Sequence, residues 1–245
     1  MKYYIIFVII LYIIYYYYEK NEDYITSMHT RMLNKDGFCT LYNRDYLETE
    51  DEPCLKLKQD VMKKLPSGYI FIDYIYKIRN VALSTFHRDV TSSKHIYNTE
   101  YPVYTLILYK YEGELLSVCP SSNISYPFCW SHIVNIKGSA GTAFLFDSDL
   151  LHAGCINNCK ERNVIQYKLC HQNDYNKLSH LHNTYTEKED ICKLSLYNTV
   201  ARKASYYFEF PINYLFYPFM TKKEDDNTII GKIQSYIPIK YYNNT

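Results

Sequence analysis

The sequence has no excess of charge of either sign, since its 245 residues carry 27 Lys and Arg against 26 Asp and Glu. Proteins that bind nucleic acid usually carry a clear basic excess, because they neutralise backbone phosphates. We therefore expect no nucleic-acid partner. The chain also lacks internal repeats and long low-complexity segments. Its length suits a single domain, or a single domain plus a tail.

No CxxC pair occurs in the chain, and the one close pair, Cys155 and Cys159, has no second pair to complete a zinc site. Structural zinc sites usually draw four ligands from such pairs. Buried or free thiols are therefore favoured over structural zinc, and disulfides stay open for a domain outside the cytosol. The eight cysteines are Cys39, Cys54, Cys119, Cys129, Cys155, Cys159, Cys170 and Cys192.

An uncharged apolar run near the N-terminus, Tyr3–Tyr18, reads YYIIFVIILYIIYYYY and is close to the shortest length that spans a bilayer. It has no small residues to mark a cleavage site, which disfavours a cleaved signal peptide, and it exceeds an ordinary strand. Its tyrosines suit a membrane interface. We therefore expect a single-pass signal-anchor over residues 1–20. Lys2, before the run, weakly favours a domain on the lumenal or extracytoplasmic side.

Hydrophobic spacing predicts one short amphipathic helix, Leu55–Leu65, which Pro66 ends. From Tyr69 onward, β-branched and aromatic residues recur in short runs between turn signals, which is typical of a β-sandwich or barrel. The predicted strands are Tyr69–Ile78, Tyr104–Tyr111, Leu115–Cys119, Ser131–Ile136, Thr142–Phe146, Leu150–Ala153 and Asn163–Leu169.

An H-x-D motif, His87-Arg88-Asp89, stands at the end of one β-like stretch. In extended backbone, residues two apart point to the same side, so His87 and Asp89 can converge on one ion while Arg88 points away. His152, which follows an apolar strand and an acidic turn, is the best third ligand. Two imidazoles and one carboxylate leave open positions for a chelating ligand and O2, as in non-haem Fe(II) oxygenases.

Arg162 lies ten positions after His152, at the start of the strand NVIQYKL. A guanidinium there can hold a carboxylate through two parallel hydrogen bonds. A dicarboxylate such as 2-oxoglutarate would chelate the metal through its keto-acid end and need this partner for its far carboxylate. The alternative for these residues is a surface pair between His87 and Asp89, with Arg162 a solvated charge.

Residues 86–171 resemble the Fe(II)/2-oxoglutarate-dependent dioxygenases, and within them the phytanoyl-CoA-hydroxylase-like branch. The resemblance rests on FHRDVT, YTLILYKYEG, CPSSN and FDSDLLHAG. It implies a mainly β, double-stranded β-helix (jelly-roll, cupin-like) core with flanking helices. It also implies His87, Asp89 and His152 as iron ligands and catalytic centre, and Arg162 as the 2-oxoglutarate partner. Asn123 departs from the family, where a histidine often follows the serine.

What the resemblance implies about activity is hydroxylation of an unidentified organic substrate, with Fe(II), 2-oxoglutarate and O2, and release of succinate and CO2. One alternative is a catalytically silent jelly-roll binding or structural module anchored to a membrane. Another is a cupin-like metalloenzyme that does not use 2-oxoglutarate. Cupin sites usually draw more histidines from H-x-H motifs, and the one here, His180–His182, lies in a polar, loop-like stretch.

The expected organisation of the chain combines these segments. The predicted parts are an anchor (1–20), a helical or irregular N-terminal support (21–66), the β-helix oxygenase domain (67–204) and an aromatic and polar C-terminal extension (205–245). The membrane is a predicted partner only because of the anchor.

Overall fold

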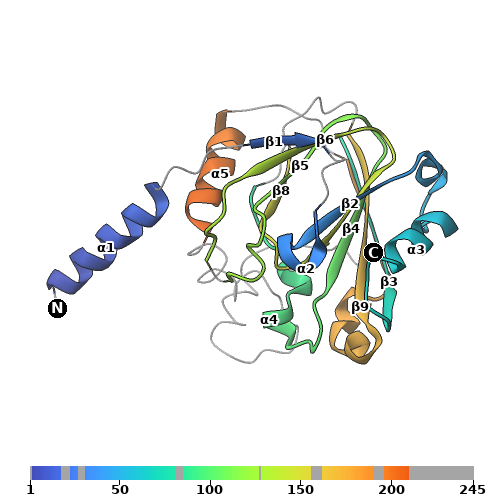
Figure 1. The fold of residues 1–245 in the computed structure, drawn as a ribbon, viewed down its shortest axis with the longest axis horizontal. Helices are drawn as coiled ribbons and strands as arrows, with labels where there is room; N and C mark the ends of the chain where they lie inside the picture. Colours follow the sequence, from blue (N-terminus) through green and yellow to red (C-terminus); the bar gives the residue numbers. More distant parts are fainter. Residues whose placement is uncertain are drawn as a thin grey trace.

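The computed structural model describes residues 2–17, 23–26, 31–80, 85–126, 128–155, 162–189 and 196–209. The core of the fold is β, arranged in two sheets (Figure 1). The mainly β prediction is therefore confirmed. The predicted C-terminal extension lies, from residue 210 onward, outside the described residues.

The larger sheet has six strands. Their spatial order is β10 (Thr184–Glu189), β3 (Tyr69–Arg79), β9 (Asn163–His171), β4 (Tyr104–Tyr109), β7 (Thr142–Asp147) and β2 (Phe38–Tyr42). All of its neighbouring strands run antiparallel except β10 and β3, which are parallel. The smaller sheet has four strands, in the order β1 (Asp23–Thr26), β6 (Val134–Gly138), β5 (Gly113–Val118) and β8 (His152–Gly154).

The chain alternates between the two sheets from β3 to β9. It passes from β3 in the larger sheet to an isolated bridge at His87, beside β8 of the smaller sheet. It returns to β4, crosses to β5 and β6, returns to β7, crosses to β8 and ends in β9. Eight chain segments that pair antiparallel and alternate in this way between two facing sheets are consistent with a jelly-roll core.

Side chains of both sheets fill the space between them. Ile107 and Tyr109 of β4 pack there with Phe144 of β7, against Leu116 and Val118 of β5. The alternate residues of β4 point outward, because successive side chains in a strand face opposite sides. They are buried too, since a helix covers that outer face, and β4 is therefore apolar along nearly its whole length.

The covering helix is α3 (Leu55–Met62), which confirms the predicted amphipathic helix. Its Leu57 and Val61 are fully buried against Leu106 and Leu108 of β4. Figure 1 places α3 beside the larger sheet and α5 (Leu196–Tyr207) beside the smaller one. The remaining helical segments are α1 (Lys2–Tyr17), α2 (Leu33–Asp36), α4 (Lys94–Tyr97) and the 3-10 segments Arg44–Glu48, Val90–Ser92 and Gln172–Leu181.

The predicted membrane anchor is wrong. The apolar N-terminal run does form a helix, α1, but this helix has only 16 residues. At 1.5 Å per residue it is about 24 Å long, whereas the hydrocarbon core of a bilayer is about 30 Å thick. In the described ranges no helix has both the length and the apolar character needed to cross a membrane. The membrane localisation and the lumenal placement inferred from the anchor are corrected with it.

Two strands of the larger sheet were absent from the predicted set. β2 lies in the stretch expected to be helical or irregular, and it pairs with the edge of β7. β10, whose sequence TYTEKE is almost entirely polar, pairs with β3 at the other edge. β10 therefore lacks the apolar pattern that marks the central strands, whereas β2 (FCTLY) is apolar but has only five residues, too few for a strand period to show.

Candidate metal centre

A backbone bridge joins the two histidines of the predicted site. The His87 N–H donates to the His152 carbonyl at 2.9 Å, and the His152 N–H donates back to the His87 carbonyl at 3.0 Å. Residues directly opposite each other in an antiparallel pair point to the same side. The two imidazole rings therefore lie together, with centroids 4.5 Å apart. His87 and His152, 65 positions apart in the sequence, thus become neighbours because the His87 segment pairs with β8 at the edge of the smaller sheet.

Both imidazoles have their Nδ1 atoms engaged by backbone. His87 Nδ1 lies 2.7 Å from the Thr85 carbonyl oxygen, and His152 Nδ1 lies 2.9 Å from the Leu150 carbonyl oxygen. A carbonyl only accepts, so each Nδ1 carries the proton and each Nε2 keeps its lone pair. A hydrogen bond of this kind is the usual arrangement behind a metal-binding histidine.

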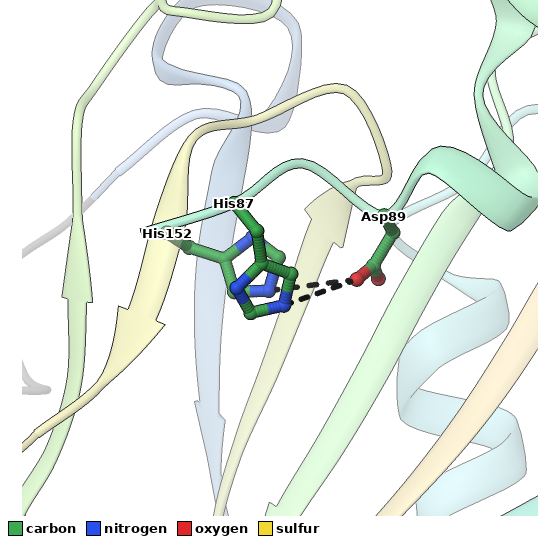
Figure 2. A group of neighbouring side chains, drawn as sticks. All are labelled: His87, Asp89 and His152. Carbon is green, nitrogen blue, oxygen red and sulfur yellow. Dashed lines mark ion pairs between the residues drawn. The ribbon is translucent and has the colours of Figure 1, made fainter. Parts of the chain in front are cut away.

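Asp89 faces both free nitrogens. Its Oδ1 is 3.7 Å from Nε2 of His87 and 3.7 Å from Nε2 of His152 (Figure 2). The Asp89 N–H donates to the Ser148 carbonyl at 2.8 Å, which holds this residue beside the turn that leads to His152. The three ligand atoms lie within 4.8 Å of one another, so the group can hold a metal ion.

The charges of the group suit a cation. Burial would raise the pKa of Asp89, but the Lys168 ammonium and the two imidazoles together hold it well below its usual value. Burial and the nearby His87 imidazole lower the pKa of His152 to about 4, although the Asp89 carboxylate alone would raise it. At neutral pH Asp89 is thus ionised and His152 neutral, which are the protonation states that bind metal.

The second oxygen of Asp89 has other partners. Its Oδ2 accepts hydrogen bonds from the Thr105 hydroxyl and the Lys168 ammonium, each at 2.6 Å. Lys168 lies on β9 and is only 1% exposed. Sequence reasoning missed its role, although a lysine on the same face of an apolar strand as Arg162 was a signal that could have found it.

Arg162 lies immediately before β9 and is buried, with 6% of its surface exposed. Its guanidinium packs directly on Gly154, two residues beyond His152, so closely that a Cβ at that position would collide with it. Tyr109 of β4 is close enough for its pKa, which burial raises strongly, to be lowered in part by the Arg162 charge. The structure therefore places Arg162 inside the fold, next to the strand that carries His152.

Arg88, between the two ligands, points away from them as predicted and is also buried. It donates to the carbonyl oxygens of Ser122 at 2.7 Å, Phe128 at 3.4 Å and, closest, Asp149. Its guanidinium also lies 3.6 Å from the Glu209 carboxylate. Arg88 therefore ties the His87–Asp89 segment to the loop after β5 and to the turn before His152.

The other histidines among the described residues lie outside the three-residue group. His180 and His182 belong to a helical segment and its end, where they stack on Tyr97 and Tyr175. Asn123, the family departure, donates to the Asp147 carboxylate at 3.0 Å. Among the described residues, His87, Asp89 and His152 form the group of histidine, cysteine and acidic side chains that can hold a metal.

No family model matches the chain, and no curated protein matches it. Solved structures do. They include EvdMO1 (13% identity, TM-score 0.43, covering 57% of this chain and 48% of that one). They also include the non-haem α-ketoglutarate-dependent epimerase SnoN from nogalamycin biosynthesis (10% identity, TM-score 0.42, covering 57% of this chain and 79% of that one). The non-haem α-ketoglutarate-dependent carbocyclase SnoK from nogalamycin biosynthesis is similar too (12% identity, TM-score 0.40, covering 57% of this chain and 81% of that one). Identities and TM-scores this low leave the family undefined, so function is inferred from the site.

Proposed function

We propose that this chain is an Fe(II)- and 2-oxoglutarate-dependent dioxygenase that hydroxylates an organic substrate. The observation that carries the proposal is the convergence of His87 Nε2, His152 Nε2 and Asp89 Oδ1, with both Nδ1 atoms held by backbone carbonyls. Two imidazoles and one carboxylate are the ligand set of non-haem Fe(II) oxygenases. The predicted cofactors fit this donor set, and 2-oxoglutarate is α-ketoglutarate, on which SnoN and SnoK depend.

Each residue then has a defined task. His87, Asp89 and His152 would hold iron, and the remaining coordination positions would receive the keto-acid end of 2-oxoglutarate and O2. Iron with 2-oxoglutarate supplies the oxidising power, and the protein supplies binding and orientation. Arg162 would hold the far carboxylate, and its burial excludes water that would weaken this ion pair. The phytanoyl-CoA-hydroxylase-like branch remains the narrower prediction, on the sequence motifs alone.

The test is a titration of the full chain with Fe(II) under anaerobic conditions, with and without 2-oxoglutarate. One iron per chain, with 2-oxoglutarate bound only in its presence, supports the oxygenase. Iron binding that 2-oxoglutarate leaves unchanged favours a cupin-like metalloenzyme instead. A folded chain that binds neither is a silent jelly-roll module.

Removing the Arg162 guanidinium is expected to weaken 2-oxoglutarate binding without changing the metal. An ion-paired hydrogen bond contributes about 1.5–3 kcal/mol, so Arg162→Ala should lower the affinity of the iron-loaded protein for 2-oxoglutarate by roughly 10–100-fold. Gly154→Ala should act in the same direction, because the added Cβ displaces the guanidinium and leaves its charge. Calorimetric titration with 2-oxoglutarate measures both.

The matched control is Arg79→Ala, which removes an exposed arginine that pairs with Glu187 on the edge of the same sheet. This variant should keep the wild-type affinity for 2-oxoglutarate. If Arg162→Ala also keeps it while the protein still binds iron, Arg162 does not hold the cosubstrate.

A further inference from the structure

Lys168 presents a cationic group directly beside the candidate metal ligands. Its Nζ atom is 2.6 Å from Asp89 Oδ2, 2.7 Å from the Thr105 hydroxyl and 2.8 Å from the Ser92 hydroxyl. The side chain is 1% exposed. A buried ammonium that lies among three oxygens, one of them a carboxylate, has the partners that burial of a charge requires.

The two oxygens of Asp89 are divided between two environments. Oδ1 faces the Nε2 atoms of His87 and His152, at 3.7 Å from each. Oδ2 is turned to Lys168 and Thr105, so its lone pairs are already used. A metal ion between the imidazoles would therefore meet a single oxygen of Asp89. A carboxylate that bound through both oxygens would occupy one of the positions that a chelating cosubstrate and O2 require.

We propose that Lys168 is a positioning residue that keeps Asp89 a one-oxygen ligand and makes the site bind a divalent metal together with a dianion. The inference rests on the proposed function and deepens it. A divalent metal, one carboxylate and one ammonium sum to a net charge of about +2 within a few ångströms. A doubly charged anion such as 2-oxoglutarate neutralises that sum. The metal alone, by contrast, enters against the repulsion of the ammonium.

A purely structural ion pair predicts a different behaviour. Lys177 and Asp174 form such a pair at 2.8 Å, away from the two histidines, and Asp174 accepts backbone N–H donors of Glu100 and Tyr101. Loss of a structural lysine at the metal site would disturb Asp89 and weaken metal binding. If Lys168 instead repels the metal and holds Oδ2, its loss would strengthen binding of the metal alone. The same loss would reduce the increase in metal affinity that the dianion causes. The two roles thus predict opposite signs.

The experiment measures Mn(II) binding by calorimetry with and without 2-oxoglutarate, on the full chain. The variants are Lys168→Met, Lys168→Arg and the control Lys177→Met, each checked for folding by circular dichroism. In the wild type, 2-oxoglutarate should strengthen Mn(II) binding. In Lys168→Met, Mn(II) alone should bind at least about tenfold more tightly, and the strengthening by 2-oxoglutarate should fall by a similar factor. Lys168→Arg, which keeps the charge, and Lys177→Met should keep the wild-type strengthening.

Lys168→Gln carries the same expectation as Lys168→Met, because it keeps an N–H donor for Asp89 and loses only the charge. A methionine variant that fails to fold is therefore replaced by the glutamine variant. If folded neutral variants bind Mn(II) no more tightly than the wild type, or keep the full effect of 2-oxoglutarate, Lys168 has a structural role only and the proposal is overturned. Absence of Mn(II) binding in the wild type overturns the metal site itself, and with it both proposals.

Discussion

His87→Ala is expected to abolish metal binding while leaving the fold intact. The variant removes one of the two imidazole ligands, and even the loss of a group that merely orients a ligand weakens metal binding by about 10–100-fold. We therefore expect the affinity for Fe(II) or Mn(II) to fall by more than about 100-fold. The His87 side chain is 39% exposed, so the metal-free protein should lose no more than about 1 kcal/mol of unfolding free energy. Calorimetric titration and chemical denaturation measure the two effects.

His95→Ala is the matched control for this variant. The His95 side chain is 46% exposed and lies 4.0 Å from an aspartate, Asp149, much as His87 lies near Asp89. It stacks on Tyr126 and is not part of the three-residue group. Its removal should leave metal affinity at the wild-type value. Undiminished metal binding by a folded His87→Ala variant would mean that the ion binds elsewhere, and the proposed centre would be wrong.

Arg88→Ala is expected to destabilise the whole domain rather than the metal site alone. Arg88 and Glu209 are 1% and 0% exposed, and truncation of one leaves the other charge buried without its counterion. Breaking a buried pair in this way costs about 3–5 kcal/mol, a large part of the roughly 5–15 kcal/mol that stabilises a typical domain. The variant also removes a donor to each of the Ser122 and Asp149 carbonyl groups. Urea denaturation of the metal-free protein measures the loss.

Two further variants separate the buried charge from ordinary packing. Arg31→Ala breaks the partly exposed pair between Arg31 and Asp36, and should cost no more than about 1 kcal/mol. Arg88→Met with Glu209→Gln removes both charges and should recover part of the stability lost in Arg88→Met alone, since no uncompensated charge remains. An Arg88→Ala variant as stable as Arg31→Ala would show that Arg88 does not hold the ligand segment.

Local patterns in the sequence were sufficient for the central strands and for α3. β4, β7 and β9 are apolar runs between turn signals, and each forms within a few residues of its predicted range. β10 is absent from the predicted set because its polar sequence resembles a loop, and β2 because its five residues are too few to show a strand period. For the N-terminal run the prediction went too far rather than falling short. Its apolar composition suggested a membrane span, but the helix that forms is too short for one.

The residues of the candidate site also divide into those that local sequence patterns predicted and those that they did not. His87 and Asp89 were recognisable together because extended backbone brings residues two apart to one side. His152 was singled out by its place after an apolar strand, and the structure does bring it to the pair. Lys168 and Thr105, which hold the second oxygen of Asp89, were not assigned that task. Their pairing depends on the register between β4 and β9, which brings Thr105 opposite Lys168.

The sequence by itself determined which strands are apolar and where the H-x-D motif stands, and it singled out His152 and Arg162 for the predicted site. These are properties of short stretches of chain, where side-chain alternation and turn residues act locally. Only the tertiary structure decided that His87 and His152 share a backbone bridge, that Arg88 is buried against Glu209, and that Lys168 reaches Asp89. Each of these contacts joins residues more than 60 positions apart. Strand pairing and the packing of two sheets create them, and no local pattern encodes either.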